Sequence, residues 1–164
     1  MLSGISLRRR LQYARGYLDL GMHEACAAEL RAINPVDESE LPVLELWVDL
    51  WMETKAWDGV IAVAPDVCRR RPAAERAWIA WAYALREKQQ VSDARAVLLD
   101  AEAHHGGSCA VLHYNLACYE CLLGNLDEAE WRLQRACKLD PHWRELALED
   151  PDLRDLRPRM LAND

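Results

Sequence analysis

The stretch that decides the fold is AVLHYNLACYECLLGNLDEAEWRLQRACKLDP, residues 110–141. Its first half carries a stripe at helical spacing, His113, Leu116, Ala117 and Glu120, and stops at Gly124. Its second half carries a second stripe, Leu126, Ala129, Leu133 and Ala136, and stops at Pro141. This order predicts a helix, a glycine turn, a second helix and a proline break.

The same pattern recurs toward the N-terminus. Trp81 takes the place of Leu116 after a shift of 35 residues, and Trp47 takes the place of Trp81 after a shift of 34. A further shift reaches a degraded copy, in which Tyr13, Ala14, Tyr17 and Gly21 survive. Since one helix pair cannot bury its own apolar face, stacked neighbours must close a continuous core. The sequence therefore predicts an all-α solenoid of stacked antiparallel helix pairs.

This pattern resembles the tetratricopeptide repeat (TPR) family. The copy at 110–141 matches the family signature at Leu116, Gly124, Ala129, Ala136 and Pro141. Four positions depart from it: Ala117 and Glu120 replace a glycine and a tyrosine, and Lys55 and Gln89 stand at two turns. The resemblance implies a right-handed superhelix in a single domain, with repeats at about residues 7–38, 41–74, 75–108 and 110–143. The segment after Pro141 resembles the ends of many bacterial TPR proteins, which suggests a bacterial source.

Two local features call for separate expectations. Pro65 lies inside the second helix of the second copy, where it removes a backbone hydrogen bond, so we expect a kink or a 3₁₀ break over residues 61–65. The chain has seven Trp and no Phe, so we expect tryptophan to supply the aromatic bulk of the core, above all Trp47, Trp51, Trp78 and Trp81.

The residues after Pro141 predict a C-terminal cap at about 143–158. Trp143, Leu146 and Ala147 are expected to pack on the last repeat, and Pro151 is expected to begin a further short helix. Open-ended solenoids need such a cap for solubility.

Composition narrows the function classes. The net charge of −7 and the sequence pI of about 5.3 disfavour nucleic-acid binding. No apolar run is long enough to predict a membrane span. Six cysteines without an export signal favour reduced thiols and a cytoplasmic protein.

Cys118 and Cys121 form a Cys-x-x-Cys pair, the one motif that suggests chemistry. A redox site would place it at a helix N-terminus beside a strand, whereas here it lies inside a predicted helix. A zinc site would need two more ligands at a suitable spacing. No phosphate loop or hydrolase motif is present, so we expect no enzyme activity, no cofactor and no metal. A metal-binding or redox protein stays open as an alternative.

In TPR proteins the first helix of each pair lines a concave groove in which a partner docks. The resemblance and the helical register together predict the groove residues Arg15, Glu45, Asp49, Arg76, Tyr83, Arg86, Tyr114, Asn115 and Cys118. Arginine can hold a carboxylate in a fork, and tyrosine offers a flat contact area. We therefore expect a protein-interaction adaptor or scaffold that binds a peptide or protein segment. A type III secretion-type chaperone is an alternative, and self-assembly into a homo-oligomer is a further one.

Overall fold

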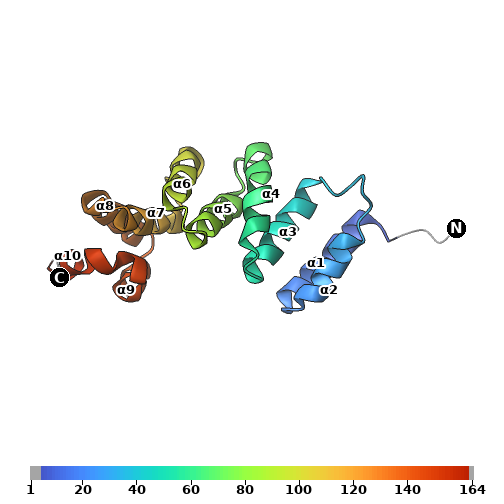
Figure 1. Cartoon of the computed structure of the whole chain (residues 1–164), viewed down its shortest axis with the longest axis horizontal. Coiled ribbons are helices and arrows are strands. Elements are labelled where there is room, and N and C mark those ends of the chain that lie inside the picture. The colour runs from blue at the N-terminus through green and yellow to red at the C-terminus, as the bar shows by residue number, and fades with distance from the viewer. Residues whose placement is uncertain (1–4, 163–164) are drawn as a thin grey trace. The chain divides into compact units, whose positions relative to one another are not determined.

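The computed structural model describes residues 5–162, and all regular structure in that range is helical (Figure 1). The elements are α1 (Leu7–Asp19), α2 (His23–Arg31), α3 (Leu41–Glu53), α4 (Trp57–Arg70), α5 (Glu75–Glu87), α6 (Val91–His105), α7 (Ala110–Leu122), α8 (Leu126–Leu139), α9 (Trp143–Glu149), the 3₁₀ helix η1 (Pro151–Leu156) and α10 (Arg157–Ala162). None of these helices combines the length and the apolarity that a bilayer crossing requires. The chain forms two compact units, one up to Ala80 and one from Trp81, with the boundary inside α5.

The first unit is built from two helix pairs. Helix α1 packs on α2, α3 packs on α4, and both helices of the first pair contact α3. The core holds small and aliphatic side chains rather than aromatic ones, among them Ala14, Cys26, Leu30, Val43 and Leu46. Small residues let neighbouring helices approach closely, as the repeat pattern requires.

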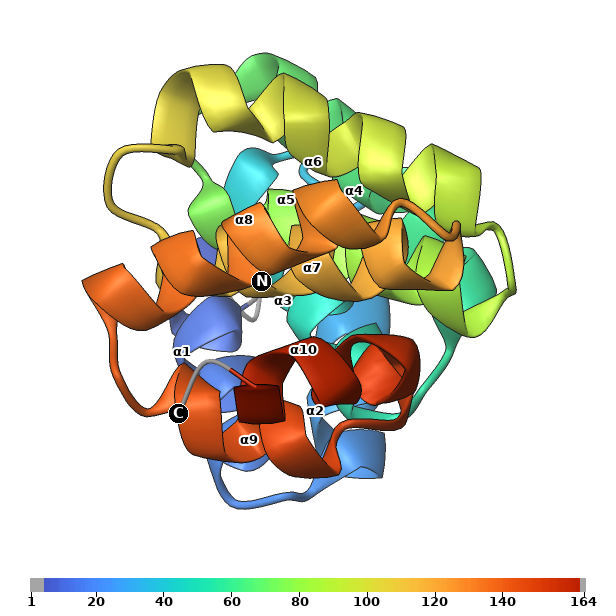
Figure 2. The ribbon, with the colours of Figure 1, turned by 90° about the vertical axis from the view of Figure 1, so that its left-hand side faces the viewer.

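The second unit pairs α7 with α8 and packs α6 against α7. Its C-terminal segment belongs to the same core, because η1 packs on α7 and α9 packs on α8. Figure 2 shows α9 and α10 lying together beside this pair. Ala147, Leu153 and Leu156 are fully buried, while Leu146 is exposed. The expected cap is present, and its main anchors are the two leucines of η1.

The turns inside the helix pairs share one backbone conformation. Gly21, Lys55, Gln89 and Gly124 all have positive φ, between 57° and 83°. At each turn the residue that follows donates its backbone N–H to a carbonyl of the preceding helix at 2.8–2.9 Å, as Ala56 does to Trp51. Such left-handed C-caps favour glycine, because a Cβ is strained there. The two departures from glycine thus keep the turn geometry at a cost in strain.

Replacing Lys55 by glycine is expected to stabilise the protein by about 0.5–1 kcal/mol, because the left-handed strain is relieved. Chemical denaturation measures the change. Lys55→Ala removes the same side chain but keeps the Cβ, so it should bring no such gain. Equal gains in the two variants would contradict the assignment of strain.

Of the two alternatives expected near Pro65, the 3₁₀ break is wrong, because α4 runs as one α-helix from Trp57 to Arg70. The kink stays a prediction. The buried face of α4 carries Val60, Ala64 and Val67, each with no exposed surface. Tertiary burial of this stripe outweighs the hydrogen bond that the proline removes.

The expectation of a tryptophan-filled core is also wrong. Among the described residues, the buried hydrophobic set is made of Ala, Leu, Val and Cys with one Ile and two Tyr, and it contains no Trp. Trp47 and Trp51 are half-buried and stack on each other with ring centroids 5.0 Å apart. Trp131 is 48% exposed. The close helix spacing set by alanine leaves no room for an indole in the interior.

Candidate functional site

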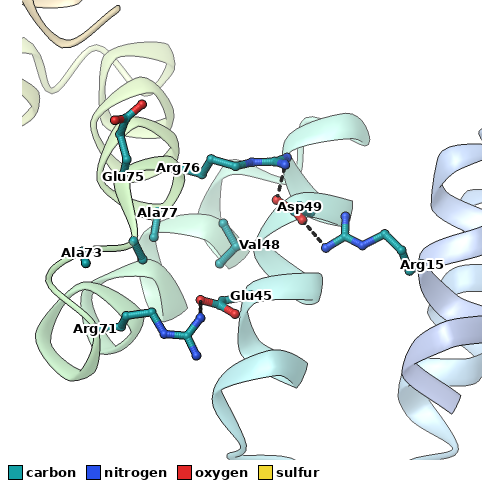
Figure 3. A pocket seen from close by; sticks show the side chains of 10 residues that line it. Arg15, Glu45, Val48, Asp49, Arg71, Ala73, Glu75, Arg76 and Ala77 are labelled. Carbon is teal, nitrogen blue, oxygen red and sulfur yellow. Dashed lines mark hydrogen bonds and ion pairs between the residues drawn. The ribbon is translucent and has the colours of Figure 1, made fainter. Parts of the chain in front are cut away.

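The first unit carries a cavity of about 370 Å³ that contains the predicted groove residues Arg15, Glu45, Asp49 and Arg76 (Figure 3). They come from α1, α3 and the first turn of α5. The apolar residues of its lining have small side chains. They are Val48 and three alanines, Ala73, Ala74 and Ala77. These short side chains leave space beside the polar groups, and an extended peptide segment could occupy that space.

Asp49 organises the polar part of this cavity. Its Oδ2 accepts from Arg15 Nη2 at 2.7 Å, and its Oδ1 accepts from Arg76 Nη2 at 3.1 Å (Figure 3). The Asp49 side chain is only 16% exposed, whereas that of Arg76 is 82% exposed. The carboxylate therefore anchors guanidinium groups that still face solvent.

A second ion pair borders the same cavity. Arg71 Nη1 donates to Glu45 Oε1 at 2.6 Å. Reasoning from the sequence missed Arg71, because it lies beyond the end of α4 and not on a first helix of a pair. With Glu75, the lining holds three arginines and three carboxylates and is formally neutral. Such a lining can offer N–H donors and carboxylate acceptors to a ligand at once.

The second unit brings together the other five predicted residues, Tyr83, Arg86, Tyr114, Asn115 and Cys118, around a cavity of about 320 Å³. Glu87 and Tyr119 also line it, and the chain's own C-terminal segment adds Asp150, Pro151 and Asp152. The predicted groove residues therefore lie in two separate cavities, one in each unit.

The C-terminal segment is held there by polar contacts to the predicted residues. Arg86 donates to both carboxylate oxygens of Asp152, with Nε–Oδ2 at 2.8 Å. The Tyr114 hydroxyl donates to Asp150 Oδ2 at 2.7 Å, and the Cys118 thiol lies 3.8 Å from the same oxygen. Arg86 thus holds a carboxylate as expected, but the carboxylate belongs to the chain itself. Nothing in the repeat pattern could place Asp150 or Asp152 on this face.

The Cys-x-x-Cys pair lies in an environment that disfavours the reactive thiolate form. Cys118 and Cys121 are each 4% exposed. Burial raises the pKa of both thiols, and the negative charge of Asp150 raises that of Cys118 further. A nucleophilic or metal-binding cysteine needs a thiolate, which this environment disfavours. Within residues 5–162, no three His, Cys, Asp or Glu side chains gather in a way that could hold a metal ion.

Two stripe residues of α7 are buried polar groups. Glu120 has no exposed surface and accepts from Arg95 and from Asn125, the latter at 2.7 Å. Because Arg95 belongs to α6, this cluster ties α6 to α7 and to the turn after it. Glu120 replaces the signature tyrosine, and its charge is compensated by these partners.

His113, also fully buried, lies between two arginines of α8. Its Nδ1 is 3.3 Å from Arg132 Nη1. Its Nε2 is 3.0 Å from Arg135 Nε and 2.8 Å from the Gly106 carbonyl oxygen. Burial is the largest cause that lowers the pKa of His113 below its ordinary value of 6.5, and the charges of Arg132 and Arg135 add to it; the Gly106 bond and Glu102 oppose it. The net effect favours the neutral imidazole in the folded protein.

The stability of the protein should therefore fall as the pH drops from about 7.5 to about 5.5, around the ordinary histidine pKa. In this range His113 binds a proton more readily in the unfolded chain than in the folded one. A fall in pH therefore favours unfolding. His113→Gln should flatten the pH dependence of the free energy of unfolding. His142→Gln, at an exposed position, is the control and should leave the dependence unchanged. A wild-type slope that survives in His113→Gln would refute the assignment.

Comparison with solved structures shows which fold this is. The chain superposes on MamA AMB-1 with a TM-score of 0.74 and 14% sequence identity, over 84% of this chain and 74% of that one. It superposes on TTC0263, a thermophilic TPR protein of Thermus thermophilus, with a TM-score of 0.68 and 20% identity, over 96% and 89%. It superposes on MamA MSR-1 with a TM-score of 0.65 and 15% identity, over 93% of this chain and 95% of that one. No protein-family model matches the sequence, and no curated protein matches it either. The chain has a TPR-like helical-repeat fold, as the sequence pattern predicts.

Proposed function

We propose that this TPR-like chain is a non-catalytic protein-interaction scaffold that binds a peptide segment of a partner in the cavity of the first unit. The observation that carries the proposal is the Asp49 centre. One largely buried carboxylate holds two arginines of different helices beside an alanine-lined space. A preformed, polar and partly open cavity of this kind suits an extended segment.

Arg76 is the residue that we expect to contact the partner most strongly. One of its nitrogens is bound to Asp49, and its side chain is 82% exposed. A guanidinium has five N–H donors, so it can take a carboxylate of the partner while it keeps its bond to Asp49. Asp49 then acts as a positioning group that fixes the direction of the fork.

The alternative functions find less support. Buried thiols with raised pKa values disfavour a redox or metal-binding role for Cys118 and Cys121. A type III secretion-type chaperone remains compatible with a TPR-like fold, but no feature of either cavity favours it over a general scaffold.

Selection of binding peptides from a displayed random library on the full chain tests the proposal. The affinity of the selected peptide should fall about tenfold or more in Arg76→Glu, since a charge-assisted contact is lost. Arg154→Glu is the matched control, because its side chain is 78% exposed and lies in the second unit. Equal affinity of the wild type and Arg76→Glu would refute the proposed site.

A further inference from the structure

The cavity of the second unit has a chemistry of its own, set by the C-terminal segment. Its lining holds one cation, Arg86, and three carboxylates, those of Glu87, Asp150 and Asp152, which makes a formal charge of −2. Arg86 is already engaged, since it donates to Asp152 and, at 3.2 Å, to Glu87. The segment thereby turns a formally neutral surface, with one arginine and one glutamate, into an acidic cavity, and such a cavity favours a cation.

Tyrosines form the rest of the recognition surface. Tyr83, Tyr114 and Tyr119 all line the cavity. Tyr114 packs against Trp143, with ring centroids 4.4 Å apart and the rings tilted by 32°. Tyr83 is 40% exposed, so part of its side chain faces solvent. An aromatic ring beside carboxylates attracts a cation through its negative face.

The hydroxyl of Tyr119 is an independent pointer to a ligand. Tyr119 is 2% exposed, and its hydroxyl has no hydrogen-bond partner within the part of the chain that the structure describes. Buried hydroxyls nearly always find a partner, and one without a partner costs free energy. A ligand that brings an N–H donor into the cavity would satisfy this oxygen.

We propose that this cavity binds an arginine side chain of a partner protein. A guanidinium carries the positive charge that the three carboxylates favour, supplies an N–H for the Tyr119 hydroxyl oxygen, and can stack on the ring of Tyr83. The volume of about 320 Å³ lies at the lower end for ligand sites and suits one long side chain better than a large ligand.

The titration behaviour of the lining agrees with an acidic site. Burial is the largest cause that raises the pKa values of Tyr83, Tyr114 and Cys118, and the carboxylates of Asp150 and Asp152 raise them further. Groups that lose a proton become negative, and a negative surrounding opposes that loss. A bound guanidinium would relieve the same excess of negative charge.

The five tyrosines of the chain make a direct test possible. In the full chain with ¹³C-labelled tyrosine rings, acetyl-Gly-Arg-Gly-amide should produce saturable shifts at Tyr83, Tyr114 and Tyr119. Tyr13 and Tyr17 lie in the first unit and should not respond. The same peptide with citrulline in place of arginine keeps the shape without the charge and should produce no shifts.

Tyr119→Phe probes the hydroxyl without removing any bond seen in the fold, so the variant should stay folded. It should weaken binding of the arginine peptide about threefold to tenfold, the worth of one hydrogen bond. Tyr13→Phe makes the same change outside the cavity and should leave binding unchanged. Equal shifts with the citrulline peptide, or unchanged affinity in Tyr119→Phe, would overturn the proposal. Either result leaves the cavity of the first unit untouched, so the two proposals fail separately.

Discussion

Replacing Gly59 by alanine should lower the free energy of unfolding by about 1–3 kcal/mol, the usual cost of overpacking. A Cβ at this position would lie 2.6–2.9 Å from three ring atoms of Trp51. Such atoms cannot approach so closely, and the indole is itself stacked on Trp47. The ring or helix α4 would have to move, which separates the two helices of this pair.

The matched control is Gly16→Ala in α1, where the new Cβ would meet no atom within 4 Å beyond its chain neighbours and the backbone of its own helix. Alanine is the better helix former, so this variant should gain up to about 1 kcal/mol. Urea denaturation followed by circular dichroism measures both changes. Gains at both positions would show that Trp51 does not restrict the approach of α4.

Shortening Leu153 to alanine should cost about 2–5 kcal/mol in the second unit. This leucine of η1 has no exposed surface, and η1 packs on α7. Its truncation leaves a void against the central helix of the unit, which close-packed neighbours fill only in part. A loss of this size would show that the C-terminal segment is part of the core of the second unit.

Leu161→Ala is the control for that loss, because Leu161 belongs to the same C-terminal segment and is 64% exposed. It should change the free energy of unfolding by less than about 0.5 kcal/mol. Thermal denaturation of both variants gives the comparison. Equal, small effects would mean that η1 contributes little to the core.

The repeat pattern predicts the parts of the fold that depend on local sequence. Gly21 and Gly124 mark left-handed turns by themselves, and alignment at the repeat length places Lys55 and Gln89 at equivalent turns. The failures come from packing. A proline is tolerated in α4 because its apolar stripe is buried, a property of the neighbours that no single helix reveals.

The candidate site was predictable to a similar extent. Arg15 and Asp49 lie 34 residues apart, one repeat length, so equivalent positions of adjacent repeats meet in the structure. Arg71 and Asp152 come from outside the first helices, and their contacts depend on how the chain leaves one element and enters the next. Spacing carries no information on such contacts.

Amide hydrogen exchange of the full chain, with and without the peptide selected for binding to it, tests the scaffold proposal most directly. The proposal predicts added protection in α1, in α3 and in the first turn of α5, where Arg15, Asp49 and Arg76 lie. Asp49→Asn should abolish that added protection, because the arginines lose their charged anchor. Protection confined to other helices, with α1 and α3 unchanged, would contradict the proposal.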